Sequence, residues 1–185
     1  MSQVFVVERA RWFGGAWPQG FVALAELPGG SGQELLRAFG RGGRFLDRPA
    51  AEADPSHKQC IPYCVLRCGP FDPADERASG VFVTVRSRGQ SEARLHHAHS
   101  IGLGGHVEPE DESPEQDGAA FFAAALQREL REELWLPEQL PAPQLCGLVN
   151  DDATEVGSVH TGLVYTLDLP LPLAAAREQI GVREI

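Results

Sequence analysis

Apolar residues along this chain gather in short runs, separated by stretches rich in Gly, Pro, Asn and Asp. Runs of this kind, with β-branched and aromatic residues, predict β-strands. The predicted strands are residues 4–7, 21–24, 60–68, 81–86, 94–105, 145–149 and 159–169. Because a turn-rich segment separates residues 60–68 from residues 81–86, we expect these two strands to pair as a hairpin.

Residues 118–134 have a helical pattern instead. Three leucines recur one turn apart and predict an apolar stripe that faces the core: Leu126, Leu130 and Leu134. Ala119 and Ala123 extend that stripe backward. Three carboxylates fall within an arc of roughly 100° beside the stripe: Glu129, Glu132 and Glu133. Arg128 and Arg131 are expected to point the other way.

The first third of the chain is less regular. A short helix is predicted over residues 33–39, with Ser31 as its N-cap and glycines in residues 40–43 as its end. Residues 45–55 are expected to be extended or looping chain. We take residues 1–57 as an N-terminal extension packed on a core of residues 58–185.

The three glutamates carry the candidate chemistry. Like charges at i,i+4 spacing on a helix cost a few tenths of a kcal/mol per pair. A bound cation would remove this cost, and hard cations such as Mg²⁺ take carboxylate, phosphate and water oxygens as ligands. A solvated acidic face is the alternative for such a helix taken alone. The upstream sequence Gly104-Gly105-His106 favours the cation site.

Together these residues resemble the Nudix box, whose pattern is G-x5-E-x7-R-E-U-x-E-E-x-G-U, with U an aliphatic residue. Gly105 matches the leading Gly, Arg128-Glu129-Leu130 matches R-E-U, and Glu132-Glu133 matches E-E. Leu136 matches the closing aliphatic residue. The resemblance is specific in this second half of the box.

The chain departs from the pattern at two places. Asp111 stands where the family has its first Glu, and the acidic residues 112–118 then read as an inserted surface loop before the helix. Trp135 stands where the family has Gly, so the usual left-handed helix cap is not implied. Neither departure removes a carboxylate of the R-E-U-x-E-E half.

The resemblance implies an α+β fold, a Nudix-type α/β/α sandwich with a mixed sheet. Segments outside the box are similar to a subgroup of predicted Nudix phosphoesterases that carries a similar N-terminal extension. Two of these segments are Ser100-Ile101-Gly102 and Asn150-Asp151-Asp152. The implied activity is metal-dependent hydrolysis of a phosphoanhydride or phosphoester bond in a nucleoside diphosphate linked to another moiety.

The resemblance also implies roles for residues. Mg²⁺ or Mn²⁺ would be held by the three box glutamates and by the backbone carbonyl of Gly104, with Arg128 holding the carboxylates in place. The candidates for contact with the substrate are Gly104, Gly105, His106, Asp151, Asp152 and Glu155. The general base would be a box glutamate or an acidic residue of the loop after residue 150. The candidates in that loop are Asp151, Asp152 and Glu155; a plain Asn/Asp-rich turn is the alternative there.

Composition narrows the classes of partner. The chain has 185 residues and a net charge of −10, which disfavours duplex nucleic acid but leaves a small nucleotide-type substrate open. No apolar run approaches the roughly 18 residues of a membrane helix, and a cytoplasmic location is expected. Cys60, Cys64 and Cys68 lie about 13 Å apart in succession along a predicted strand, so we expect buried thiols rather than ligands of one ion.

Two further functions stay open: a non-catalytic Nudix-fold nucleotide-binding or sensor protein, and a protein-interaction module that uses the acidic insertion. The segment after residue 170 is short for the helix that usually covers one face of a Nudix sheet. Either the N-terminal helix, with Leu35, Leu36 and Phe39, covers that face, or a second subunit does, and we expect a homodimer.

Overall fold

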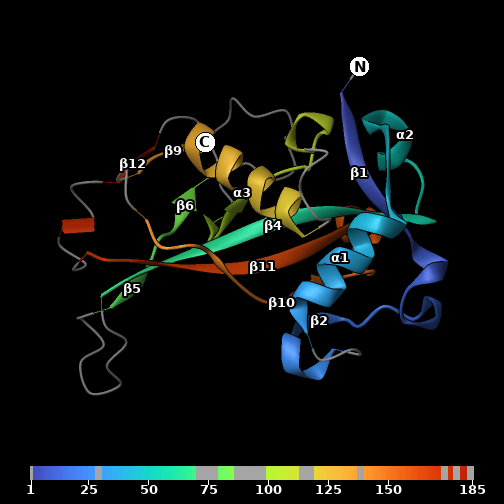
Figure 1. Ribbon diagram of the computed structural model, residues 1–185, viewed down its shortest axis with the longest axis horizontal. Coiled ribbons are helices and arrows are strands. Elements are labelled where there is room, and N and C mark those ends of the chain that lie inside the picture. Colours follow the sequence, from blue (N-terminus) through green and yellow to red (C-terminus); the bar gives the residue numbers. More distant parts are fainter. Residues whose placement is uncertain are drawn as a thin grey trace.

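The computed structural model describes residues 2–27, 31–69, 79–85, 99–112, 119–136, 140–171, 175–176 and 180–182. Within these residues the main feature is an eight-stranded sheet (Figure 1). Its order is β2-β10-β11-β4-β1-β3, and β5 and β8 also pair with β4. The predicted α+β fold with a mixed sheet is confirmed.

The sheet is built around two long parallel strands, β4 (His57–Cys68) and β11 (His160–Leu169), which pair along their length. The remaining pairings in this sheet are antiparallel. The other strands of the sheet are β1 (Gln3–Glu8), β2 (Gly20–Ala23), β3 (Arg44–Asp47), β5 (Gly80–Val81), β8 (Leu103–Gly104) and β10 (Gln144–Asn150). Two small sheets join β6 (Thr84–Val85) to β7 (His99–Ser100) and β9 (Leu134–Trp135) to β12 (Gly181–Val182).

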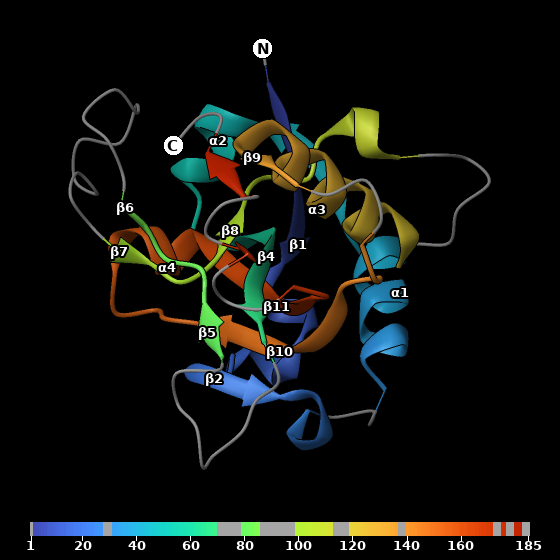
Figure 2. The same cartoon turned by 90° about the vertical axis from the view of Figure 1, so that its left-hand side faces the viewer.

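Two helices cover one face of the main sheet, which we call the helix face. α3 (Ala120–Glu133) and α1 (Gly32–Gly42) lie on the same side of β4 and β11 (Figure 2). The predicted leucine stripe of α3 is buried in a core shared with α1 and the strands. Residues of this core include Leu36, Phe39, Phe122, Leu126, Leu130, Leu163 and Leu167. Cys60, Cys64 and Cys68 are buried free thiols, as predicted.

The N-terminal segment is more regular than its sequence suggests. Residues 45–55, expected to be extended or looping, instead contribute strand β3 and helix α2 (Arg48–Glu52), which begins with Pro49 in its first turn. Helix α1 ends at Gly42 with Gly43 as its C-cap, within the glycine-containing residues 40–43 that were expected to end it. The Ser31 cap is confirmed, since its side chain accepts from the Glu34 N–H at 3.5 Å.

Other boundaries also differ from the expectation. The segment expected as one strand over residues 81–86 is divided between β5 and β6, and of residues 94–105 only 99–105 are described, as β7 and β8. The predicted pairing of residues 60–68 with 81–86 is present, because Arg67 pairs with Val81. The connection after residue 150 contains a short helix, α4 (Glu155–Val159), capped by Thr154.

The division at residue 57 stays a prediction. Strands β1 and β3 belong to the same sheet as β4, and β2 pairs with β10 at the far edge. The N-terminal helix α1 contributes to the same core as α3, so it does not cover the opposite face of the sheet. We call that opposite face the open face. No described helix is long and apolar enough to cross a membrane.

A buried ion pair ties the N-terminal end of β4 to the connection between β10 and β11. The Lys58 side chain is fully buried, and its Nζ donates to Asp152 Oδ1 at 2.5 Å. The same amine donates to the carbonyl oxygens of Gly157 at 2.5 Å and His160 at 3.3 Å. Burial lowers the pKa of Lys58, and the Asp152 carboxylate works in the opposite direction.

The Lys58→Met variant should lower the free energy of unfolding by about 3 kcal/mol, because it leaves Asp152 without its buried partner. Arg67→Met is the matched control, since Arg67 and Asp168 also join β4 to β11 but are 48% and 64% exposed. That exposed pair should contribute less than about 1 kcal/mol. Urea unfolding measures both values, and equal losses in the two variants would contradict the assignment.

Candidate functional site

Arg128 lies at the centre of the candidate site. Its guanidinium forms two hydrogen bonds to the Asp111 carboxylate, each at 2.9 Å. The same group donates to Glu129 Oε1 at 2.7 Å, to Glu132 Oε2 at 3.4 Å and to the His106 carbonyl oxygen at 2.8 Å. These partners raise the pKa of Arg128, with the Asp111 hydrogen bond as the largest cause. The expectation that Arg128 points away from the glutamates is therefore wrong.

The reason is the position of Asp111. Its side chain is only 3% exposed and lies in a 3₁₀ turn, Pro109–Asp111, next to the helix. Asp111 Oδ2 also accepts from the Glu108 backbone N–H at 2.9 Å. A buried carboxylate requires a paired charge, and the arginine on α3 supplies it. The motif position that holds Asp in place of Glu thus contacts the motif arginine across the insertion.

The box helix begins at Ala120, and Glu112 already has an extended backbone. A helix running unbroken from Glu110 to Leu134 is thereby excluded. Residues 113–118, the rest of the predicted insertion, lie outside the described residues. At the other end the chain leaves α3 with Leu134 in an extended conformation and enters β9, where Trp135 pairs with Gly181. The helix therefore ends without a left-handed cap, consistent with Trp135 in place of Gly.

The three glutamates differ in their surroundings. The Glu129 side chain is 15% exposed, and burial raises its pKa against the opposing effect of Arg128. Glu132, one turn further along, is 57% exposed on the same side of Arg128. Glu133 is half-buried at the last residue of α3. Glu129 and Glu132 both bond to one Arg128 nitrogen, so the carboxylates share an edge as predicted.

The two glycines before the box helix allow two close approaches. A Cβ on Gly105 would lie 2.3 Å from the Glu129 carboxyl carbon, so only glycine leaves room for that carboxylate. A Cβ on Gly104 would lie 1.9 Å from the Pro62 carbonyl oxygen, where β8 runs against β4. Gly105 therefore makes space for a functional side chain, and Gly104 makes space for the backbone of the sheet.

The remaining candidates lie in other surroundings. Asp152 is held by Lys58, Arg9 and Gln19, and these hydrogen bonds lower its pKa although burial works to raise it. Asp151 is exposed and accepts from the Ala153 N–H at 3.0 Å, in the local turn that its sequence favours. Glu155 is exposed in the first turn of α4. A role for these three acids in catalysis stays a prediction.

The His106 imidazole belongs to a different group of side chains from the glutamates. It contacts the ring of His160, with centroids 5.6 Å apart. Burial lowers the pKa of His106 to about 3, with nearby Arg48 as the next cause, so the ring is neutral. Only the backbone carbonyl of His106 reaches Arg128. The sequence placed Asp111 in the motif but did not predict its pairing with Arg128, and it did not predict the contact between His106 and His160, because these partners are distant along the chain.

Comparison with known proteins supports the fold. No protein-family model matches the sequence. Protein YmaB of Bacillus subtilis (strain 168) is 38% identical over 141 residues, which cover 74% of this chain and 61% of YmaB. The chain thus spans less than two thirds of that relative. A solved structure, "Crystal structure of Tm1382, a putative Nudix hydrolase", matches 97% of this chain and 83% of its own, with a TM-score of 0.66 and 25% identity. The fold of this chain is therefore similar to that of a putative Nudix hydrolase, which supports the suspected relation to the Nudix superfamily.

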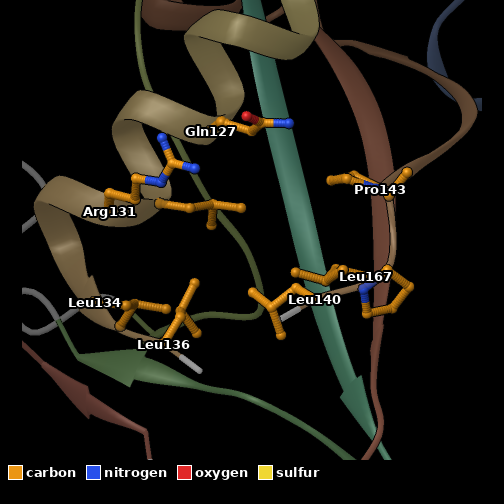
Figure 3. A pocket seen from close by; sticks show the side chains of 10 residues that line it. Gln127, Arg131, Leu134, Leu136, Leu140, Pro143 and Leu167 are labelled. Atoms are coloured by element: carbon orange, nitrogen blue, oxygen red, sulfur yellow. The ribbon is translucent and has the colours of Figure 1, made fainter. Parts of the chain in front are cut away.

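A large cavity next to the Nudix helix does not contain the box glutamates. Its volume is about 510 Å³, and Figure 3 shows it between α3 and the segment that precedes β10. Leucines and prolines form most of its wall, together with Gln127 and Arg131 of α3. Because α3 presents Glu129 and Glu132 on another side, this cavity and the Nudix box are separate features.

Alanine substitutions at the two glycines should differ in how much they lower the free energy of unfolding. Gly104→Ala should lower the free energy of unfolding by about 2 kcal/mol or more, since the clash is with backbone. Gly105→Ala should cost less than about 1 kcal/mol, because the Glu129 carboxylate can move aside. Urea unfolding of both variants tests this. A greater loss in Gly105→Ala than in Gly104→Ala would contradict the placement of Glu129.

Proposed function

We propose that this Nudix protein hydrolyses a phosphoanhydride or phosphoester bond in a nucleoside diphosphate linked to another moiety, with Mg²⁺ or Mn²⁺ as the cofactor. The observation that carries the proposal is the arrangement around Arg128. One guanidinium holds Glu129 and Glu132 on a common edge and is itself fixed by buried Asp111. Gly105, directly after β8, leaves room for the Glu129 carboxylate.

The donors present suit the proposed cation. Glu129, Glu132 and Glu133 offer carboxylate oxygens, and the Gly104 carbonyl is the further ligand that the superfamily implies. All are hard oxygen donors, as Mg²⁺ and Mn²⁺ require. When bound, the ion would polarise the phosphoryl oxygens and lower the pKa of the attacking water.

The residues of the chain would supply position and charge. Arg128 keeps the carboxylates from separating under their mutual repulsion, so that little reorganisation is needed when substrate arrives. Gly105 and His106, which follow β8 beside Glu129, would be in position to contact a substrate phosphate. A water molecule oriented in line with the leaving group then needs a proton acceptor.

We assign the proton acceptor to a box glutamate or to an acid of the connection after β10. Both oxygens of Asp152 already accept hydrogen bonds from Lys58, Arg9 or Gln19, which disfavours Asp152 as that proton acceptor. A nucleotide sensor without activity is the second candidate. Retention of all three box glutamates favours the hydrolase.

Glu132→Gln and Glu133→Gln should each lose at least about 100-fold in turnover, because each replaces a proposed metal ligand. Activity is measured as phosphate or nucleoside monophosphate released from a panel of nucleoside diphosphate derivatives, with Mg²⁺, Mn²⁺ or excess chelator. Glu34→Gln, an exposed glutamate in the first turn of α1, is the control and should keep full activity.

Two outcomes would contradict this proposal. Near wild-type turnover in both folded variants would exclude the glutamates as ligands. Tight nucleotide binding with no turnover in either metal, by the unmodified chain, would favour the sensor instead.

We further propose that the chain is a cytoplasmic homodimer that associates through the open face. Support comes from two exposed apolar residues of the sheet: Phe21 on β2 is 55% exposed, and Val81 on β5 is 46% exposed. Large exposed apolar patches are uncommon on monomers. Sedimentation equilibrium at micromolar concentration should give twice the chain mass, and Phe21→Asp should give monomer. A monomeric unmodified chain would exclude this assembly.

A further inference from the structure

The extended chain at Gly104-Gly105-His106 directs successive residues to alternate faces of the sheet. Gly104 pairs with Tyr63 of β4, and successive residues of an extended chain point to opposite faces. Gly105 faces Glu129 and the helix face. The next side chain, His106, therefore lies on the open face, where it meets His160. This position is separated from the box glutamates by the thickness of the sheet.

Three potential metal ligands meet on the open face. They come from separate parts of the chain: Glu52 at the end of α2, His106 after β8, and His160 at the start of β11. One ligand atom from each lies within 4.8 Å of the other two. The backbone pairing of β4 with β11 and the packing of α2 on β1 fix where these residues lie.

Hydrogen bonding leaves the imidazoles ready to bind a metal. His160 Nδ1 lies 2.7 Å from the Val156 carbonyl oxygen, a contact that requires the proton on Nδ1 and leaves the lone pair on Nε2. A histidine ligand usually has its other nitrogen fixed in this way. His106 Nε2 is buried and has no hydrogen-bond partner among the described residues. A buried nitrogen without a partner is costly, and a metal ion would supply one.

A second polar side chain without a partner lies beside them. Gln59 pairs with His160 in the parallel register of β4 and β11, so the two side chains neighbour each other on the open face. Gln59 is 1% exposed, and neither atom of its amide has a hydrogen-bond partner in the described part of the chain. A water molecule or an anion bound to a metal here would supply hydrogen-bond partners for this amide.

One contact opposes metal binding. Arg48 Nε lies 3.5 Å from Glu52 Oε1, one turn earlier on α2, and both side chains are largely exposed. This contact is long and open to solvent, so it competes weakly for the carboxylate. Zinc bonds of about 2.0–2.2 Å place ligand atoms closer together than 4.8 Å. The exposed Glu52 side chain can close that difference by rotation.

We propose that Glu52, His106 and His160 form a binding site for a divalent transition metal, best fitted by Zn²⁺, on the face of the sheet opposite the Nudix box. Two imidazoles and one carboxylate are a donor set for zinc and its neighbours, whereas Mg²⁺ prefers oxygen alone. Three protein ligands would leave one position open for water or a ligand, and Gln59 neighbours the His160 ligand. This site does not depend on the proposed hydrolase activity.

The experiment is a Zn²⁺ titration of the full chain, freed of metal with a chelator and then held in excess Mg²⁺. Calorimetry should show one zinc site per chain that Mg²⁺ does not displace. His160→Gln and Glu52→Gln should weaken zinc binding roughly 100-fold and 10-fold, respectively. Arg48→Ala should leave it unchanged or tighter. Co²⁺ bound to the unmodified chain should show visible d–d absorption without thiolate charge transfer.

His99→Gln is the matched control, because His99 is an exposed histidine on β7 outside the cluster. This variant should bind zinc as the unmodified chain does. Glu52 lies on the surface of a short helix, so Glu52→Gln keeps the test valid if a histidine variant does not fold. Loss of binding in His99→Gln, retention in Glu52→Gln and His160→Gln, or a thiolate signal with Co²⁺ would each overturn the proposal.

Discussion

The candidate site depends on one guanidinium that is shared among four partners. Arg128 pairs with buried Asp111 in a two-point contact, and its remaining donors reach Glu129, Glu132 and the His106 carbonyl. Because Asp111 is almost fully buried, removing either partner would leave a charge in a site with little water. The acidic edge is thus held in place before any cation binds, and its repulsion is offset by a charge on the same helix.

A second buried charge lies at the start of β4. Lys58 at the start of β4 bonds Asp152 and two backbone carbonyls of the α4 turn, which fixes the connection leading into β11. His160 begins β11 directly after that turn. The position of the His160 ring therefore depends on a network whose centre is a lysine on the helix face.

The local sequence pattern predicted most helices and strands, whereas contacts between distant segments determine how the side chains of the site are oriented. The leucine stripe of α3 and the strands over residues 60–68 and 159–169 follow from periodicity, which depends on neighbours in sequence. The orientation of Arg128 could not be read in this way, since a helical wheel does not contain Asp111. Counting the Nudix pattern across the insertion did reach Asp111. Helix α2 was not predicted because it is only five residues long and contains Pro49, so its sequence resembles a turn.

His106 makes contacts on both faces of the sheet. The His106 carbonyl accepts from Arg128 on the helix face, while its ring lies against His160 on the open face. A metal ligated by that ring would restrict the backbone that forms the floor of the Nudix box. Glycine at residue 105 leaves room for the Glu129 carboxylate, and extended geometry then directs the following side chain away from it. That residue is His106, whose buried Nε2 has no hydrogen-bond partner among the described residues. The open face therefore offers a potential metal ligand, as the helix face does.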